Sequence, residues 1–144
     1  QSAGLIRYLG KRGDMADLLA EVDVVCLPTM YREGIPRILI EAGAVGRPVI
    51  TTDVAGCSEL ITDGRNGRLV KAGSVAQVEQ TILDLAQSFE TVVSMGKNAR
   101  HNVEEAFSNR RVIAEHLDVY ANMIGDNAHQ DRALRSSPAA REHR

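Results

Sequence analysis

Aromatic side chains are scarce in this sequence, and basic residues do not outnumber acidic ones. Of the 144 residues only 3% are aromatic, none is tryptophan, and the formal net charge is -2. The sequence pI is near 6.1. A nucleic-acid-binding surface combines a basic stripe with stacking aromatics, and this sequence has no such combination. We therefore expect no nucleic-acid partner.

Long apolar runs and cysteines are also lacking. No run approaches the roughly 20 apolar residues that a membrane-spanning helix needs, so we expect no membrane insertion. The two cysteines, Cys26 and Cys57, are too few for a disulfide framework. Cys26 is expected to be a buried strand residue. This cysteine usage favours a reducing compartment, and we expect a cytoplasmic protein.

Recognisable metal and nucleophile patterns are missing as well. The four histidines lie late in the chain without the spacing of zinc ligands. No Asp-x-Asp pair is positioned to hold a metal between phosphates, and no serine or cysteine is placed with a histidine for nucleophilic catalysis. We expect neither a metal nor another cofactor.

The sequence does contain a clearly marked strand–helix–strand unit. An apolar strand at residues 22–27 runs into a polar loop, and a second strand at residues 49–52 closes the unit. Pro36 suits the first helical position, because its fixed φ is already helical and its missing N–H would be unpaired there. Gly46 and Pro48 mark the end of this helix. The helix between them is almost entirely apolar, which predicts that it is buried.

The start of this helix predicts an anion site. With Pro36 in the first position, Ile35 takes the cap, where its side chain cannot accept a hydrogen bond. The free N–H groups around the helix start then face the loop, with the positive end of the helix dipole behind them, which suits a phosphate. These groups belong to Gly34, Ile35, Arg37 and Ile38.

Two glutamates accompany the helix start. Glu41 is a carboxylate among apolar residues, and burying it would require hydrogen-bond donors such as a ligand diol. Glu33 stands in the loop just before the helix. Each residue also has a purely structural interpretation, in which Glu33 caps the helix and Glu41 lies on its one wet face.

Strands and helices alternate along the chain, which predicts an α/β fold: a Rossmann-like parallel sheet with helices on both faces, forming one domain over residues 1–125. Ligands of such sheets bind at the carboxyl ends of the strands, so the loops at residues 10–13, 28–35 and 53–56 should converge on one rim. The other expected elements are strands at 5–9 and 68–70, a helix at 15–22 capped by Asp14, and helices at 57–61, 74–87, 90–106 and 109–124.

Each late helix carries an apolar stripe that is expected to face the core. The stripes are Val75, Val78, Ile82 and Leu85; Val92, Val93, Ala99 and Val103; and Val112, Ile113, Leu117, Tyr120 and Ile124. From Gly125 onward large apolar residues all but vanish, and residues 126–144 are predicted to form a disordered tail.

The segment from Val22 to Ile50 resembles the donor-binding half of retaining glycosyltransferases with the GT-B fold, those of glycosyltransferase family four. Glu33 and Glu41 match the two glutamates of that family's Glu-x7-Glu motif. Residues 53–59, 63–70 and parts of the late helices match the segments that follow it, in the same order. The resemblance therefore covers the chain from about residue 5 to residue 124.

The resemblance implies a role for each matching residue. Glu41 would bind the ribose hydroxyls of a sugar nucleotide, and Glu33 would face the donor sugar as the catalytic residue. Backbone groups around the helix start and the second loop would approach the sugar and diphosphate, and backbone near Arg12 would meet the base. These donor-binding residues are Gly34, Ile35, Pro36 (which offers no N–H), Arg37, Ile38 and Gly56. The family's reaction retains the anomeric configuration and needs no essential metal.

Two elements of the family, a basic pair that clamps the diphosphate and an amino-terminal acceptor domain, have no counterpart here. We expect the donor-binding domain of a longer enzyme, inactive alone. Its parent would use a UDP-linked sugar in polysaccharide or glycoconjugate synthesis. The acceptor, a glycan or a lipid-linked molecule, would bind through the other domain, and the full-length enzyme could lie peripheral to a membrane. Two alternatives stay open: half of a sugar-nucleotide 2-epimerase, and a non-catalytic nucleotide-sugar binding module.

Overall fold

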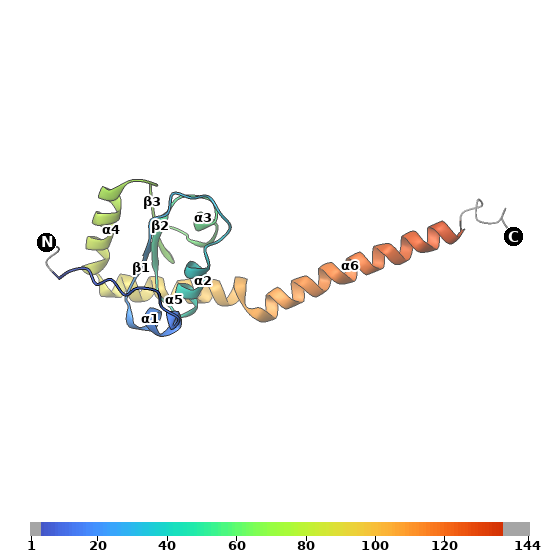
Figure 1. The fold of residues 1–144 in the computed structure, drawn as a ribbon, viewed down its shortest axis with the longest axis horizontal. Coiled ribbons are helices and arrows are strands. Elements are labelled where there is room, and N and C mark those ends of the chain that lie inside the picture. Colours follow the sequence, from blue (N-terminus) through green and yellow to red (C-terminus); the bar gives the residue numbers. More distant parts are fainter. Residues whose placement is uncertain (1–3, 137–144) are drawn as a thin grey trace. The chain divides into compact units, whose positions relative to one another are not determined.

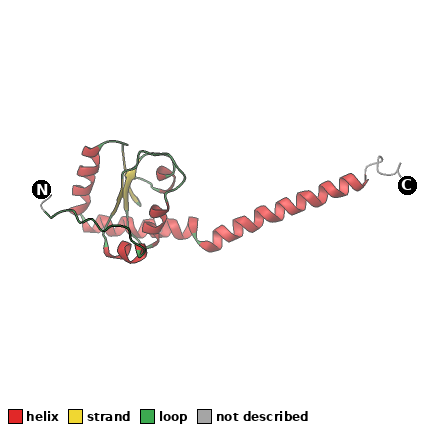
Figure 2. Ribbon diagram, in the orientation of Figure 1, coloured by secondary structure: helices red, strands yellow, loops and turns green. Residues whose placement is uncertain are grey.

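The computed structural model describes residues 4–136, with side chains described for residues 4–124. The chain divides into two compact units, Gln1–Glu105 and Ala106–Arg144. In chain order the elements are α1 (Met15–Glu21), β1 (Val25–Leu27), α2 (Arg37–Ala44), β2 (Val49–Thr52), α3 (Cys57–Leu60), β3 (Gly67–Val70), α4 (Val75–Ala86), α5 (Phe89–Phe107) and α6 (Asn109–Ser136). Figure 1 labels them along the chain, and Figure 2 separates helices from strands by colour.

The first unit is built on a parallel sheet in the order β1-β2-β3. Val25 pairs with Val49, and Val49 in turn pairs with Gly67. All four residues of β2 are buried, because helices cover both faces of the sheet. Figure 1 shows α4 on one side of the strands and α2 and α3 on the other. The predicted α/β architecture is thus confirmed.

The two faces of β2 pack against different helices, since successive strand residues point to opposite sides. Ile50 belongs to a core cluster with residues of β3, α4 and α5, namely Val70, Leu85, Val92 and Met95. Its neighbour Val49 faces the other layer, which includes Leu39, Leu60, Ala99 and Val103. Helix α5 therefore contributes side chains to both layers.

Helix α2 ends in the way that its sequence predicts. Gly46 has φ +72°, the left-handed conformation that glycine adopts without strain. Its N–H donates to the Gly43 carbonyl at 2.8 Å, and the Arg47 N–H donates to the Ala42 carbonyl at 2.8 Å, which together form a Schellman motif. Helix α5 crosses this turn closely, because a Cβ on Gly96 would lie 2.2 Å from the Gly46 oxygen.

The expected strand at residues 5–9 does not form. The segment has no regular structure, and Leu5 and Tyr8 are 89% and 92% exposed. A strand needs a neighbour to satisfy its backbone groups, and within residues 4–136 no strand lies beside this segment. Local β-propensity was therefore insufficient.

Several predicted boundaries and burials also differ from the structure. The strand predicted at residues 22–27 is only Val25–Leu27, and Cys26 is exposed rather than buried. Its side chain lines an open cavity beside Ile50 and Ile82, next to β1, which is an edge of the described sheet, so it keeps contact with solvent. Pro36 is the cap of α2, with ψ 127°, and Arg37 is its first helical residue.

The predicted stripes of the late helices are only partly buried. In α4, Leu85 is buried as expected, but Val75 and Ile82 are 79% and 46% exposed, and Thr81 is buried instead. In α5, Val92, Ala99 and Val103 are buried, whereas Val93 is exposed. In each helix fewer apolar residues are buried than the predicted stripe contains, so periodicity alone assigned too many residues to the core.

The second unit consists largely of α6, which continues to Ser136. Its predicted core residues are exposed in the structure, from 38% for Val112 to 70% for Ile124. A single helix cannot bury its own apolar face, since this requires a second packed element. Of the predicted tail, residues 126–136 continue α6, with side chains that are not described, and residues 137–144 lie outside the described residues.

Candidate functional site

Two loops follow the carboxyl ends of adjacent strands: residues 28–35 after β1 and residues 53–56 after β2. We call them the rim loops. The Thr51 hydroxyl donates to the Leu27 carbonyl at 2.8 Å, and the Thr52 hydroxyl donates to the carbonyl of Thr29. Both threonines are fully buried in β2. The end of β1 and the first residues after it are thus fixed to β2 by side chains as well as by the strand ladder.

Gly56 brings the two rim loops into contact. It has φ +85°, and a Cβ built on it would lie 2.5 Å from the carbonyl oxygens of both Glu33 and Gly34. Only glycine allows this approach, because it has no Cβ and tolerates a positive φ. The structure therefore places the predicted residues Glu33, Gly34 and Gly56 side by side.

Helix α2 starts at this rim. Its cap, Pro36, makes no side-chain hydrogen bond to the helix, and the first turn contains no acidic residue. The Leu39 N–H bonds back to the Pro36 carbonyl at 3.0 Å. Arg37 and Ile38 occupy the first two helical positions, where amides have no carbonyl one turn earlier to bond. The helix thus starts one residue later than predicted, with the amides of Arg37 and Ile38 at its open end, and an anion site there stays a prediction.

Glu33 lies exposed in the first rim loop. The structural alternative, in which it caps α2, is wrong, since no side chain caps this helix. Its neighbours Gly34 and Ile35 are exposed and half-buried respectively, and they lead directly into the helix start. A free carboxylate therefore stands at the edge of the sheet, beside backbone that can approach a ligand.

Glu41 is less isolated than its apolar neighbours suggest. Its side chain is 31% exposed, and its Oε1 accepts from the Nε of Arg37 at 2.6 Å. The Arg37 side chain is itself 89% exposed, so the ion pair is largely solvated and contributes little to stability. Glu41 thus lies on a wet face of α2 as a charged acceptor that a ligand could share.

Arg12 does not join this group. Its guanidinium pairs with Asp14, with Nε 2.6 Å from Oδ1, and this hydrogen bond and charge lower the pKa of the Asp14 carboxyl. Asp14 sits at the cap position of α1 but makes no side-chain cap bond there, because the bidentate arginine occupies its oxygens. Figure 1 places the turn before α1 at the opposite end of the sheet from the rim loops. The expected convergence of residues 10–13 on the rim is thus wrong, because the unformed strand at 5–9 does not carry them there.

A cavity of about 370 Å³ opens beside the rim loops. Pro28, Met30 and Thr52 line it from the ends of β1 and β2, and Lys71, Ser74 and Val78 line it from the chain after β3. Lys71 was not predicted as a residue of the rim, although its position directly after a strand would have indicated this. The cavity supplies an apolar wall and one cation next to the rim.

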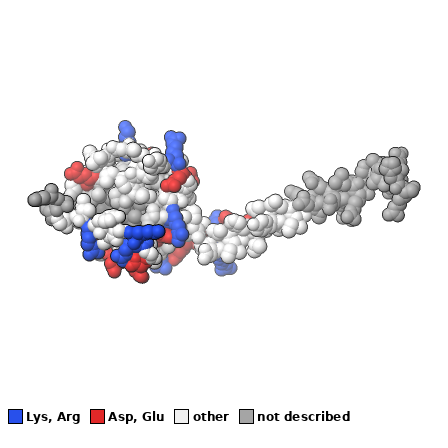
Figure 3. All heavy atoms as spheres, in the orientation of Figure 1, with Lys and Arg blue, Asp and Glu red and all other residues white. Residues whose placement is uncertain are grey.

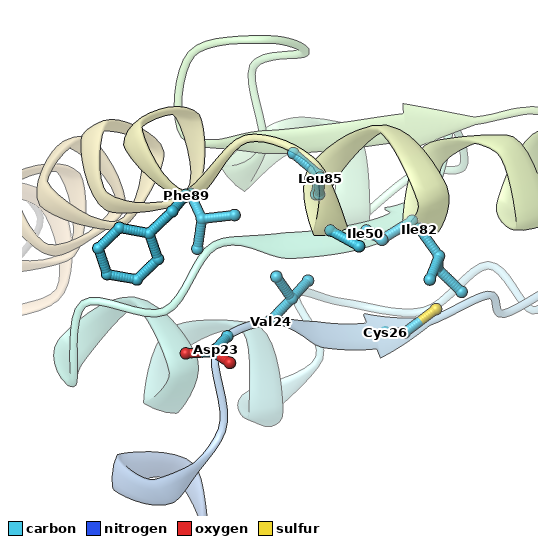
Figure 4. A pocket seen from close by; sticks show the side chains of 9 residues that line it. Asp23, Val24, Cys26, Ile50, Ile82, Leu85 and Phe89 are labelled. Atoms are coloured by element: carbon cyan, nitrogen blue, oxygen red, sulfur yellow. The ribbon is translucent and has the colours of Figure 1, made fainter. Parts of the chain in front are cut away.

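A second cavity, of about 360 Å³, lies between β1 and the α4–α5 corner (Figure 4). Its lining is mostly apolar, with Val24, Ile50, Leu85 and Phe89 around it, and Asp23 is the one carboxylate among the labelled residues. Partial burial here raises the pKa of the Cys26 thiol. None of the predicted donor-binding residues lines this cavity.

The described part of the chain contains no cluster of His, Cys, Asp and Glu side chains able to hold a metal ion. Among the same residues, no helix has the length and apolar character to cross a membrane. On the face shown in Figure 3, acidic and basic side chains are intermixed over the first unit.

Comparison with known proteins places these features in context. Residues 1–88 match the family model described as "Glycosyl transferases group 1". Over 122 residues the chain is 31% identical to an N-acetyl-alpha-D-glucosaminyl L-malate synthase of Bacillus anthracis, covering 85% of this chain and 32% of the relative. It is 30% identical over 124 residues to an N,N'-diacetylbacillosaminyl-diphospho-undecaprenol alpha-1,3-N-acetylgalactosaminyltransferase of Campylobacter jejuni, with the same shares covered.

Solved structures give the same picture. The fold matches HepE of Anabaena in complex with UDP, with a TM-score of 0.72 and 27% identity, over 78% of this chain and 32% of that one. It also matches HepE in complex with UDP-glucose, with a TM-score of 0.73 and 26% identity, over 81% of this chain and 33% of that one. The chain thus spans about a third of the length of the relatives that it matches.

Proposed function

Because the chain belongs to the glycosyl transferases group 1 family, we propose that it is the donor-binding domain of an enzyme that transfers a sugar from a nucleotide sugar to an acceptor. The observation that carries the proposal is the contact of Gly56 with Glu33 and Gly34 at the start of α2. This contact joins a carboxylate, exposed backbone and a helix amino terminus at the carboxyl edge of the sheet, where ligands of parallel sheets bind. UDP and UDP-glucose complexes of a structural relative support a nucleotide-sugar donor.

The start of α2 would receive the diphosphate. The amides of Arg37 and Ile38 stand at the positive end of the helix dipole, and the exposed Arg37 side chain adds a cation beside them. As the bond from the sugar to the diphosphate breaks, negative charge grows on the diphosphate. Fixed donors aimed at that charge stabilise the transition state more than the ground state.

Glu41 would bind the ribose. Its Oε1 is held by Arg37 at 2.6 Å, which orients the carboxylate without enclosing it. A ribose diol offers two O–H donors, and hydrogen bonds to a charged acceptor contribute about 1.5–3 kcal/mol each. Glu33, exposed one turn before the helix, would face the donor sugar. A contact of Arg12 with the base stays a prediction that no geometry at the rim supports.

We further propose that the reaction retains the anomeric configuration, that it needs no metal, and that the parent belongs to glycosyltransferase family four. The motif positions of Glu33 and Glu41 support this assignment. A glycan or lipid-linked acceptor would bind outside this chain. The name of one relative, a capsular polysaccharide biosynthesis glycosyltransferase of Staphylococcus aureus, supports a role in polysaccharide synthesis. A parent in the cytoplasm or at the membrane surface stays a prediction.

The test is titration of the chain with UDP-glucose and with UDP, followed by amide NMR. We expect micromolar to millimolar affinity, about -4 to -8 kcal/mol, with shifts at residues 33–41 and 53–59. Glu41→Gln should weaken UDP binding at least about tenfold, since the charged acceptor is lost. Glu104→Gln is the matched control, because Glu104 pairs with Arg100 in the same i,i+4 arrangement at 2.7 Å on α5. Equal UDP affinity in the two variants would refute the ribose role.

A further inference from the structure

Helix α3 leads from Gly56, in the second rim loop, into the layer of residues that packs on the Val49 side of the sheet. It begins after Gly56, whose N–H donates to the Glu59 Oε1 at 3.3 Å, and it ends at Leu60. Cys57 and Leu60 are 0% and 3% exposed. A helix of one turn spans only about 6 Å and is not stable by itself, so its position is set by what holds its two ends.

The carboxyl end of α3 is held by two asparagines. The Leu60 carbonyl accepts from the Nδ2 of Asn66 at 2.9 Å and from the Nδ2 of Asn102 at 3.1 Å. Both lone pairs of a helix-terminal carbonyl, which has no intrahelical partner, are thereby satisfied. Asn66 is buried, and its Oδ1 also accepts from the Thr62 N–H at 2.7 Å.

Asn102 is the more informative of the two because it comes from a different element. It lies on α5, which packs against the rest of the domain through the buried residues Val92, Met95, Ala99 and Val103. Its bond to Leu60 ties α3 to this rigid helix across 42 positions of sequence. Asn98 makes a similar bond one turn earlier, from Nδ2 to the Arg65 carbonyl at 2.9 Å, but it reaches the turn before β3 and not α3.

We propose that Asn102, together with Asn66, is a positioning residue for the donor site: by holding the Leu60 carbonyl it keeps α3 seated, and thereby keeps Gly56 against Glu33 and Gly34. This inference rests on the proposed donor-binding function. The chain of contacts runs from α5 through the Leu60 carbonyl and the single turn of α3 to Gly56. Gly56 packs so closely against the first rim loop that not even a Cβ would fit between them. A displacement at one end of so short a helix is passed to the other end.

The experiment compares Asn102→Ala and Asn102→Asp with Asn98→Ala at a temperature where all three variants are folded. The aspartate has the shape of asparagine but presents a carboxylate that cannot donate to Leu60 at neutral pH. We expect both Asn102 variants to shift the backbone amides of Gly34 and Gly56 and to weaken UDP-glucose binding between about threefold and fivefold, because ligand binding must then reseat α3 without the stabilisation of that hydrogen bond. Asn98→Ala should leave the Gly34 and Gly56 amides and the affinity within twofold of the parent chain.

The outcomes separate this inference from the proposed function. If the unmodified chain binds no UDP-glucose, the donor-binding function is wrong and the positioning role falls with it. If the chain binds, and the Asn102 variants only melt earlier while the amides of Gly34 and Gly56 and the affinity stay unchanged, then Asn102 merely stabilises the fold. An Asn98→Ala effect equal to that of Asn102→Ala would likewise overturn the inference, since it would show a general response to loosening α5.

Discussion

Substituting Gly56 by alanine tests the rim geometry most directly. The new Cβ would lie 2.5 Å from two carbonyl oxygens, whereas ordinary contacts begin at 3.4 Å, so the rim loops must separate by about 0.9 Å. The substitution also places alanine at φ +85°, which costs about 1–2 kcal/mol. The first effect displaces the proposed sugar and diphosphate contacts, and the second lowers stability.

Gly64→Ala separates these two effects. Gly64 has a similar φ of +75°, but a Cβ there would meet nothing within 4 Å. Both variants should therefore lose melting temperature through backbone strain, about 4–8 °C per kcal/mol for a domain of this size. Only Gly56→Ala should also weaken UDP-glucose binding, by at least about tenfold or 1.4 kcal/mol, because misplacing binding groups by about 1 Å is costly.

The assay is calorimetric titration of UDP-glucose at a temperature at which both variants are folded, with melting curves recorded in parallel. Equal affinity of the Gly56→Ala and Gly64→Ala chains would refute the reasoning, since it would mean that the contact between the rim loops has no part in donor binding. A melting temperature of Gly56→Ala equal to that of the parent chain would show that the loops separate without cost.

Three further predictions concern single groups and the chain as a whole. Glu33→Ala should leave UDP affinity within about twofold but remove the advantage of UDP-glucose over UDP; a selective loss of melting temperature instead would assign Glu33 a structural role. A thiol reagent should label Cys26 and spare Cys57, which is 0% exposed, in the folded chain. Because burial raises the pKa of the Cys26 thiol, its labelling rate should keep rising above pH 8.5, the ordinary value for cysteine, and a plateau below that pH would contradict the assigned environment. Finally, the chain incubated with donor and acceptor should release no nucleotide, since one half of a two-domain cleft cannot hold both substrates in register, and turnover would show that the catalytic groups are misplaced.

The central strand–helix–strand unit was predictable because its signals are local. Proline before the helix, glycine and proline after it, and apolar strands on both sides all describe backbone conformations that those residues favour by themselves. The structure reproduces the order of the elements and the helix end at Gly46, with its positive φ, while Pro36 caps α2 and the first strand is shorter than predicted. The positions of Glu33 and Glu41 at the start of α2 were predictable for the same reason, whereas their roles in donor binding stay predictions.

What could not be predicted depends on neighbours that are distant in sequence. The segment at residues 5–9 has strand propensity but no strand beside it in the described sheet. The apolar neighbours of Glu41 predicted an isolated carboxylate, but Glu41 pairs with Arg37 and is partly exposed. The exposed stripe of α6 shows that periodicity predicts an apolar face but not the element that packs against it. The Leu60 carbonyl, which joins Asn66 and Asn102, has no sequence signature at all, because its two donors lie on different elements.

The complete burial of β2 has a consequence for measuring motion at the rim. Its residues are paired with a strand on each side and covered by helices on each face, so their amides should exchange with solvent only when the whole domain unfolds. Gly56 lies only four residues after β2, but its amide bonds to the Glu59 side chain and not to a neighbouring strand. The exchange rate of Ile50 then gives the global unfolding free energy, and any faster exchange at Gly56 gives the free energy of opening the rim alone. One hydrogen-exchange experiment on the unmodified chain would thus show how much of the donor site is preformed before any ligand is added.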